Sequence, residues 1–316
     1  MRASRWMLCL TLAAALLVGT TGATSAAPKA KAPAAAKVKP GPDCNGRGVP
    51  LSKVSIQLWT FAEYIGFGTD AATQRRLEEV LRRLREMGYR NVEPFTLSGL
   101  TPEEFRALLD RYGLKAPSRH VEVGRPTSPV DFEAILEENR RLGIKYFGSG
   151  GTPRDQLTTE ADWIAYAEYL NELGEMARKA GQTLMIHNHD WEFETTFGGR
   201  TVFEILMEHT DPRNVVFQLD LYWATNGGGL DNPVEVLERY GKRIELFHVK
   251  DMAPGTFPGR IEIVGEGIID FPEIFSASHG PARYYVVEHD PRFGDPTFDP
   301  FEAAQAGIDY LRCVRF

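Results

Sequence analysis

Histidines and carboxylates gather at the carboxyl ends of short apolar segments of this chain. Five of the seven histidines lie at such ends: His120, His187, His189, His248 and His289. Asp220 and Glu288 lie at two of these ends as well. A mixed set of imidazole and carboxylate groups suits a divalent ion, and its nitrogen content favours a transition metal over Mg²⁺. The ends of four consecutive segments therefore predict the metal ligands His187, Asp220, His248 and Glu288, with Mn²⁺, Co²⁺, Zn²⁺ or Mg²⁺ as the cofactor.

Three residues beside these ligands are candidate catalytic bases: Glu192, His189 and Lys250. Glu192 offers a carboxylate five residues beyond His187. A lysine in a desolvated metal site can titrate at low pH. The alternative roles are structural, because His189 can support a ligand histidine and Lys250 can pair with Asp251.

Four further residues at segment ends are candidates for binding substrate: Trp59, Glu93, His120 and Trp223. Sugars have apolar C–H faces that stack on aromatic rings, which suits the two tryptophans. Glu93 and His120 can hydrogen-bond sugar hydroxyls, and the alternative is that they satisfy one another as a polar pair.

The apolar segments alternate with amphipathic stretches from residue 53 to the end of the chain. The predicted strands are Val54–Leu58, Asn91–Pro94, Lys115–Val121, Lys145–Phe147, Thr183–His187, Val215–Asp220, Glu245–Val249 and Tyr284–Glu288. Between them, stretches such as Thr73–Met87 carry leucines and valine at helical spacing. Eight strand–helix units without a glycine-rich phosphate turn predict a single-domain α/β fold, a (β/α)8 TIM barrel. Active sites of such barrels lie at the carboxyl ends of the strands, where the candidate residues are.

The N-terminal region has the features of an export signal. Arg2 and Arg5 precede the apolar run Met7–Val18, and small residues follow near Ala26. The run is shorter than the roughly 20 residues of a membrane span, so we predict a signal peptide over 1–27 rather than an anchor. A Pro/Ala/Lys-rich flexible linker follows over 28–43, and the barrel occupies 44–316.

Two cysteines remain after removal of the signal, Cys44 and Cys313. Disulfides persist in exported proteins. Both cysteines lie at the end of the barrel opposite the predicted site, so we predict that they form a disulfide, with two free thiols as the alternative. The predicted location is periplasmic or extracellular.

Charge and composition exclude several classes of protein. The chain has 43% hydrophobic and 25% charged residues, as in a folded globular protein. Its net charge is −7, and because six basic residues and one acidic residue lie in 1–43, the rest carries −12. A strongly acidic domain lacks the basic surface that a nucleic-acid partner requires.

Five segments together resemble the xylose-isomerase-like barrels, a family of sugar isomerases and epimerases with more distant abasic-site endonucleases. The segments are IHNHDWEF (186–193), QLDLYW (218–223), FHVKD (247–251), VGEGIIDF (264–271) and VVEHD (286–290). The resemblance covers about residues 50–316. Epimerases of this family hold their metal with Glu, Asp, His and Glu, which implies ligand roles for Asp220, His248 and Glu288 here. His187 stands where those enzymes have the first glutamate. This departure removes one of two paired bases and favours a reaction with a single proton abstraction.

Export and the resemblance together lead to a functional hypothesis. Some exported relatives act on 3-keto-glycosides, which implies a metal-dependent lyase or hydrolase that removes the proton beside the ketone and expels the C1 substituent. The first alternative is sugar isomerisation or epimerisation without bond cleavage. The second is a non-catalytic carbohydrate-binding barrel. The expected partner is a small sugar or keto-glycoside, with no nucleic acid, no membrane span after signal removal and no indication of oligomeric state.

Overall fold

The computed structural model describes residues 48–255, 259–278 and 282–316. The predicted signal peptide, the linker and Cys44 lie outside these ranges, so export, the domain boundaries and the disulfide stay predictions. Within the described ranges, no helix combines the length and hydropathy needed to cross a bilayer.

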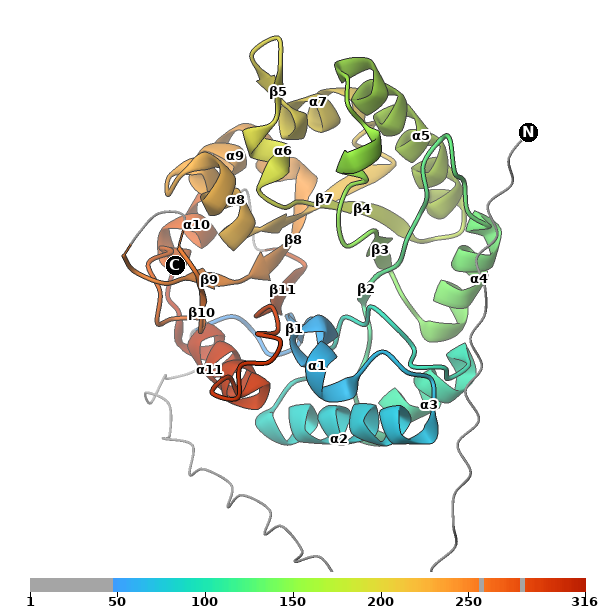
Figure 1. Cartoon of the computed structure of the whole chain (residues 1–316), viewed down its shortest axis with the longest axis vertical. Helices are drawn as coiled ribbons and strands as arrows, with labels where there is room; N and C mark the ends of the chain where they lie inside the picture. The colour runs from blue at the N-terminus through green and yellow to red at the C-terminus, as the bar shows by residue number, and fades with distance from the viewer. Residues whose placement is uncertain (1–47, 256–258, 279–281) are drawn as a thin grey trace, which may run out of the picture. The chain divides into compact units, whose positions relative to one another are not determined.

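Seven parallel strands form one curved sheet with helices on its outer side (Figure 1). In sheet order the strands are β1 (Val54–Ile56), β11 (Tyr284–Val287), β8 (Ile244–Val249), β7 (Val215–Asp220), β4 (Thr183–His187), β3 (Tyr146–Gly148) and β2 (Ser118–His120). First and last strands of the chain thus pair directly, Val54 opposite Tyr285. Pairing of β1 with β11 is what a closed barrel requires.

The remaining gap, between β1 and β2, is filled by residues 90–94. The Glu93 N–H donates to Ile56 O at 2.7 Å, and the Leu58 N–H donates to Glu93 O at 2.9 Å. On the other side the Val92 N–H donates to Lys115 O and the His120 N–H to Pro94 O, at 2.8 and 3.0 Å. This segment is the predicted strand Asn91–Pro94, and it pairs through isolated bridges because Pro94 has no N–H to extend the ladder. The eight-unit barrel prediction is therefore confirmed.

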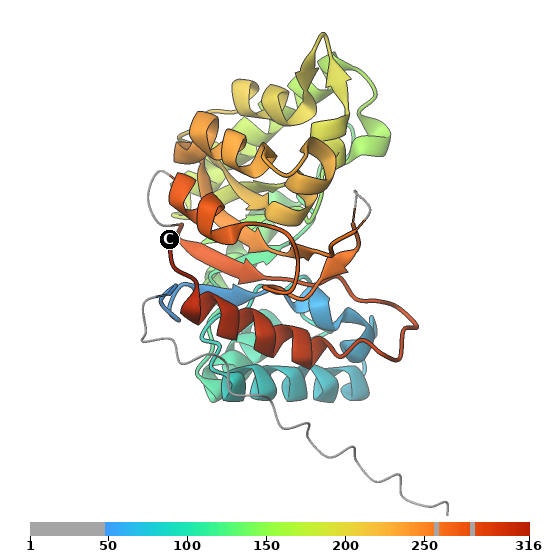
Figure 2. The same ribbon diagram turned by 90° about the vertical axis from the view of Figure 1, so that its left-hand side faces the viewer.

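Helices cover the barrel on its outer side (Figure 2). They are α1 (Ala62–Ile65), α2 (Ala71–Met87), α3 (Pro102–Tyr112), α4 (Phe132–Leu142), α5 (Glu160–Lys179), α6 (Trp191–Glu194), α7 (Val202–His209), α8 (Leu221–Gly228), α9 (Asn232–Tyr240), α10 (Phe271–Ala277) and α11 (Pro300–Cys313). In α2 the stripe Leu77, Val80, Leu81 and Leu84 is buried. A capping box of Thr101 and Glu104, with a proline at the first position, starts α3. These local signals explain why α3 begins at Pro102, whereas α2 begins two residues before the predicted Thr73 because Asp70 caps it by accepting from the N–H groups of Ala72 and Thr73.

Short 3-10 helices and two small hairpins complete the described elements. The 3-10 helices are η1 (Leu58–Phe61), η2 (Arg154–Gln156) and η3 (Gly241–Arg243). The hairpins pair β5 (Thr196–Phe197) with β6 (Arg200–Thr201) and β9 (Asp251–Met252) with β10 (Ile261–Glu262). The loops after β4 and β8 thus carry secondary structure of their own.

The interior of the barrel changes from apolar to polar along the strands. Tyr146, Met185, Val216 and Leu246 form a cluster of their own, separate from the core under the helices. Side chains two residues apart on a strand face the same way. The positions two residues further along β4, β7 and β8 are His187, Gln218 and His248. The apolar layer is therefore the base on which the polar site rests.

Candidate active site

Glu93 is the centre of a buried hydrogen-bond network. Its Oε1 accepts from Gln57 Nε2 at 2.8 Å and from His248 Nε2 at 2.7 Å. Its Oε2 accepts from Gln218 Nε2 at 2.8 Å and from the hydroxyl of Ser118. Burial would raise the pKa of Glu93, but the charges of His120 and His248 outweigh it and lower that pKa to about 2. Glu93 is therefore an ionised group that accepts hydrogen bonds from four side chains on or directly after different strands.

His248 lies between two carboxylates. Nδ1 is 2.8 Å from Glu288 Oε2, while Nε2 faces Glu93. Ionised carboxylates only accept hydrogen bonds, so both ring nitrogens donate. Burial would lower the pKa of His248, but Glu288 and Glu93 raise it to about 10. A histidine that ligates a metal must lose this proton, so metal binding here is coupled to proton release.

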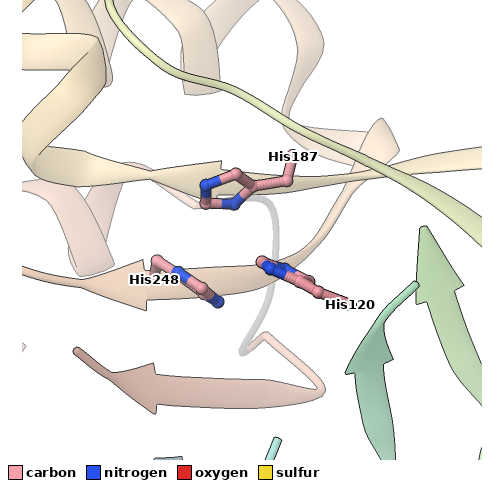
Figure 3. Close-up of side chains that lie close together, drawn as sticks. All are labelled: His120, His187 and His248. Atoms are coloured by element: carbon pink, nitrogen blue, oxygen red, sulfur yellow. The ribbon is translucent and has the colours of Figure 1, made fainter. Parts of the chain in front are cut away.

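Gln218 connects the other two histidines of this layer. Its Oε1 lies 2.8 Å from His120 Nε2 and 3.1 Å from His187 Nδ1. Figure 3 shows the rings of His120, His187 and His248 converging, and the centroids of His187 and His248 are 4.6 Å apart. Burial and the charge of His248 lower the pKa of His187 well below its ordinary value.

The four predicted ligands divide between two groups that share His248. Asp220, His248 and Glu288 form one group, and His120, His187 and His248 form the other; within each, the ligand atoms lie within 4.8 Å of one another. Asp220 Oδ2 is buried and accepts no hydrogen bond from the described residues, although the Lys250 ammonium lies 3.3 Å from it. This oxygen and the N/O donor set fit a divalent transition metal.

Lys250 supplies a positive charge beside this set. Its Nζ lies 2.8 Å from Glu288 Oε2, 3.3 Å from Asp220 Oδ2 and 3.1 Å from Asp290 Oδ1. Burial would lower the pKa of Lys250, but these three carboxylates raise it well above its ordinary value. The ammonium is therefore a fixed cation in this structure, and its carboxylate partners are Asp220, Glu288 and Asp290 rather than Asp251, the partner in the alternative structural role.

A cavity of about 390 Å³ opens above this layer. It is lined by Trp59, Phe95, His120, Val121, Glu122, Gly150, His187, His189, Lys250, Glu288 and Asp290. A buried set of candidate metal ligands at the base of a cavity with ionisable walls is the arrangement expected of a catalytic pocket.

The three candidate bases occupy different positions. His189 and Lys250 line the cavity, whereas Glu192 is fully buried and is absent from its lining. Glu192 accepts from the Thr152 hydroxyl and from the His189 N–H. Burial raises the pKa of Glu192 to about 7. Its contacts are those of a residue that positions His189 rather than one that reaches substrate.

The His189 ring is held by stacking. It lies on Trp191 with centroids 4.1 Å apart and planes 8° apart, and Arg154 covers Trp191, 4.2 Å from that ring's centroid. His189 Nδ1 is buried and has no hydrogen-bond partner among the described residues. Burial and Lys250 lower the pKa of His189 to about 3. A neutral imidazole with a free nitrogen can accept a proton.

Only two of the four predicted substrate-binding residues line the cavity. Trp59 and His120 line the cavity, while Glu93 and Trp223 are not among its lining residues. Glu93 is occupied by the network described above. Trp223 packs on Tyr222 and His189, with Lys250 Nζ 5.4 Å from its ring centroid.

Sequence reasoning missed two acidic wall residues, Glu122 and Asp290, and the buried amides Gln57 and Gln218. The two-residue period of a strand could have identified three of them, because residues two positions apart face the same way. Glu122 lies two positions after His120, Asp290 two after Glu288, and Gln218 two before Asp220. The role of Gln57 depends instead on its hydrogen bond to Glu93, which comes from the neighbouring segment.

Comparison with known proteins identifies the family to which this chain is similar. Residues 81–313 match the model of a family described as "Xylose isomerase-like TIM barrel". An inosose dehydratase of Lacticaseibacillus casei (strain BL23) is 30% identical over 305 residues, covering 83% of this chain and 97% of that protein.

Two solved structures illustrate the fold. A sugar phosphate isomerase/epimerase from Parabacteroides distasonis ATCC 8503 superposes with a TM-score of 0.68 at 24% identity, covering 87% of this chain and 98% of that one. The IOLI protein with a binding zinc atom superposes with a TM-score of 0.60 at 17% identity, covering 83% and 98%. At these identities the two structures show the shared fold.

Proposed function

Because the chain belongs to the xylose isomerase-like TIM barrel family, we propose that it is an exported, divalent-metal-dependent sugar enzyme. Its proposed reaction removes the proton beside the ketone of a 3-keto-glycoside and expels the aglycone by β-elimination. The relative named inosose dehydratase supports the reaction class, because dehydration is also an elimination.

One observation carries this proposal. A single cavity is lined by Glu288 and His187 from the candidate metal set and by the ionisable groups His189 and Lys250. Proton abstraction next to a carbonyl requires a base and stabilisation of the negative charge that develops on oxygen. Both are available in this cavity.

Asp220, His248 and Glu288 are the residues that would hold the metal, with His187 adjoining them across His248. When bound, a divalent ion acts as a Lewis acid that polarises a carbonyl oxygen. The zinc atom bound by the IOLI protein is consistent with such an ion. Glu93 holds His248 in place, and Gln218 holds His187 and His120.

The proton and the electrons follow a balanced path. His189 takes the proton from C2, beside the C3 ketone, and the Lys250 ammonium stabilises the negative charge on the enolate. The C1–O bond then breaks as a C1=C2 double bond forms. The proton held by His189 passes to the departing oxygen, so the aglycone leaves as an alcohol and both residues return to their starting states.

The test is incubation of the metal-loaded mature protein with a 3-keto-glucoside in D₂O, followed by proton NMR. We expect release of the aglycone and a new unsaturated or hydrated keto-sugar. Deuterium at C2 without release would replace elimination by isomerisation or epimerisation. No change with several sugar classes would favour a carbohydrate-binding barrel.

A second candidate is dehydration of a cyclic keto-polyol, which the named relative favours. It uses the same proton abstraction with water as the leaving group. Parallel incubation with an inosose distinguishes the two, since water loss gives a new conjugated ketone that absorbs in the ultraviolet.

A further inference from the structure

A continuous set of aromatic rings leads from the cavity wall to solvent. Trp59 and Phe95 line the cavity, with ring centroids 5.0 Å apart and planes at 88°. Trp59 also contacts Phe67 at 5.9 Å and Phe293 at 6.3 Å. We call these four residues the aromatic strip. Trp59 is its centre, with the pocket on one side and two outer phenylalanines on the other.

The two outer rings are unusually exposed. Phe67 is 65% exposed and Phe293 is 56% exposed, yet their centroids are 6.3 Å apart. A single exposed apolar side chain needs no explanation, but a contiguous patch beside a pocket marks a binding surface. The exposed rings of Phe67 and Phe293 therefore extend the apolar wall of the pocket beyond Trp59.

Hydrogen bonds hold the two loops that carry these rings. The Gly294 N–H, next to Phe293, donates to Glu63 Oε1 of α1 at 2.9 Å. Arg76 Nε donates to Ile65 O, near Phe67, at 2.8 Å. The loop that carries Phe293 is thus tied to α1, and the end of α1, two residues before Phe67, is tied to α2.

We propose that the aromatic strip binds the leaving group of the substrate, and that this leaving group is a planar, apolar ring system. The inference rests on the proposed function and specifies its substrate class, aryl rather than alkyl 3-keto-glycosides. With the sugar beside His189 and Lys250, the aglycone extends along Trp59 toward Phe67 and Phe293. Aromatic rings stack or meet edge-to-face at such separations.

The size of the patch favours a small molecule over a protein partner. Two half-exposed phenylalanine rings offer on the order of 200 Å². A stable protein interface needs about 800 Å² from each partner. A bicyclic aromatic aglycone fits this smaller area.

Binding can be measured separately from catalysis with unoxidised glucosides, which lack the ketone that acidifies C2. We would measure the Kd of 2-naphthyl β-glucoside and methyl β-glucoside by calorimetry. We expect about tenfold tighter binding of the naphthyl compound, since an aromatic contact contributes about 0.5–1.5 kcal/mol beyond area burial.

Phe67→Ala and Phe293→Ala test the two outer rings one at a time. Each should reduce the naphthyl preference to about threefold or less and leave the Kd of methyl glucoside unchanged. Phe316→Ala is the matched control, because Phe316 is 51% exposed but packs on Phe275 and Tyr285, away from the cavity. It should keep the full preference.

Three results would overturn the inference: no preference in the parent protein, equal weakening of both ligands in the variants, or a change of oligomeric state on loss of either ring. The two proposals fail separately. Elimination from 3-keto-glucosides without an aryl preference removes the inference alone, whereas an aryl preference without elimination removes the proposed function alone.

Discussion

At the scale of single residues, the site is a balance of buried charges that are satisfied by one another. Glu93 and Glu288 hold His248, while Asp220, Glu288 and Asp290 surround Lys250. A buried charge that loses its partner costs about 3–5 kcal/mol. Single substitutions in this set therefore combine effects on stability with effects on the site, and each needs a readout that separates the two.

For Asp220 and His248, measuring the metal content separates an effect on the site from an effect on stability. Asp220→Ala and His248→Ala each remove one member of the Asp220, His248 and Glu288 group. We expect more than the roughly 10- to 100-fold loss of affinity that follows removal of a ligand's hydrogen-bond partner. Metal titration with inductively coupled plasma analysis measures this, with circular dichroism to confirm folding.

His187→Glu is the informative companion to these variants. If His187 is a ligand, glutamate would supply another metal-binding donor at that position, and metal should stay bound while rate or outcome changes. Folded Asp220→Ala or His248→Ala protein with full metal content and full activity would refute the assignment. His187→Ala protein with unaltered metal and rate would remove His187 from the ligand set.

Glu192 predicts a pH dependence of stability. Its pKa is raised by burial from 4.5 to about 7, so the folded state holds the proton more tightly than the unfolded state. The stabilisation of the folded state by protonated Glu192 is fully present below pH 4.5 and is lost as pH rises through 7. A shift of this size corresponds to about 3 kcal/mol at most.

Glu192→Gln should remove this part of the pH dependence, because the amide resembles the protonated carboxyl group. Urea unfolding at pH 5 and pH 8 measures it: the parent protein should lose up to about 3 kcal/mol more than the variant. Glu194→Gln, an exposed neighbour in α6, is the control and should behave as the parent. Equal losses in parent and Glu192→Gln protein would contradict the prediction.

At the scale of elements, the loop after β10 depends on one carboxylate. Asp251 accepts hydrogen bonds from the backbone N–H groups of Met252, Gly265, Gly267 and Ile269, at 2.8–3.2 Å. Gly267 passes so close that an added Cβ would lie 2.2 Å from Asp251 Oδ1. The Asp251 carboxylate therefore accepts hydrogen bonds from backbone N–H groups of the loop that in a helix or sheet would donate to carbonyl oxygens. We call this contact the anchor of the loop.

Asp251→Asn should loosen this loop, because an amide group presents a donor where four N–H groups need acceptors. We expect a loss of about 1–3 kcal/mol of stability and faster proteolysis within residues 263–269. Limited proteolysis with mass spectrometry locates the cleavage. Glu266→Gln, exposed in the same loop, is the control and should leave the cleavage rate unchanged. Unchanged cleavage in Asp251→Asn protein would show that the anchor is dispensable.

At the scale of the whole molecule, the prediction that remains is export with a disulfide between Cys44 and Cys313. Closing a loop this long would stabilise the folded state by about 5–6 kcal/mol in the chain-entropy model. The protein secreted with its own leader should begin near residue 28 and show no free thiol in denaturant. Reduction or Cys313→Ser should lower Tm. Two titratable thiols, or an intact leader, would contradict this.

The alternation of strands and helices, the barrel and the row of ligand-type residues were all readable from the sequence. Those features depend on short-range patterns, namely strand period, helix stripes and caps such as Thr101. The expectation that the chemistry lies at strand ends follows from the barrel, and the cavity lies there.

Only the tertiary structure decided which polar groups meet. Glu93 lies in the network below the cavity rather than on its wall, and Glu192 lies behind His189, since direction depends on how neighbouring strands and loops pack. His187 groups with His120 because Gln218 accepts from both rings. The aromatic strip joins Phe67 and Phe293, which are more than 220 positions apart. Sequence periods determine the face on which a residue lies, but contacts between distant segments arise from closure of the barrel.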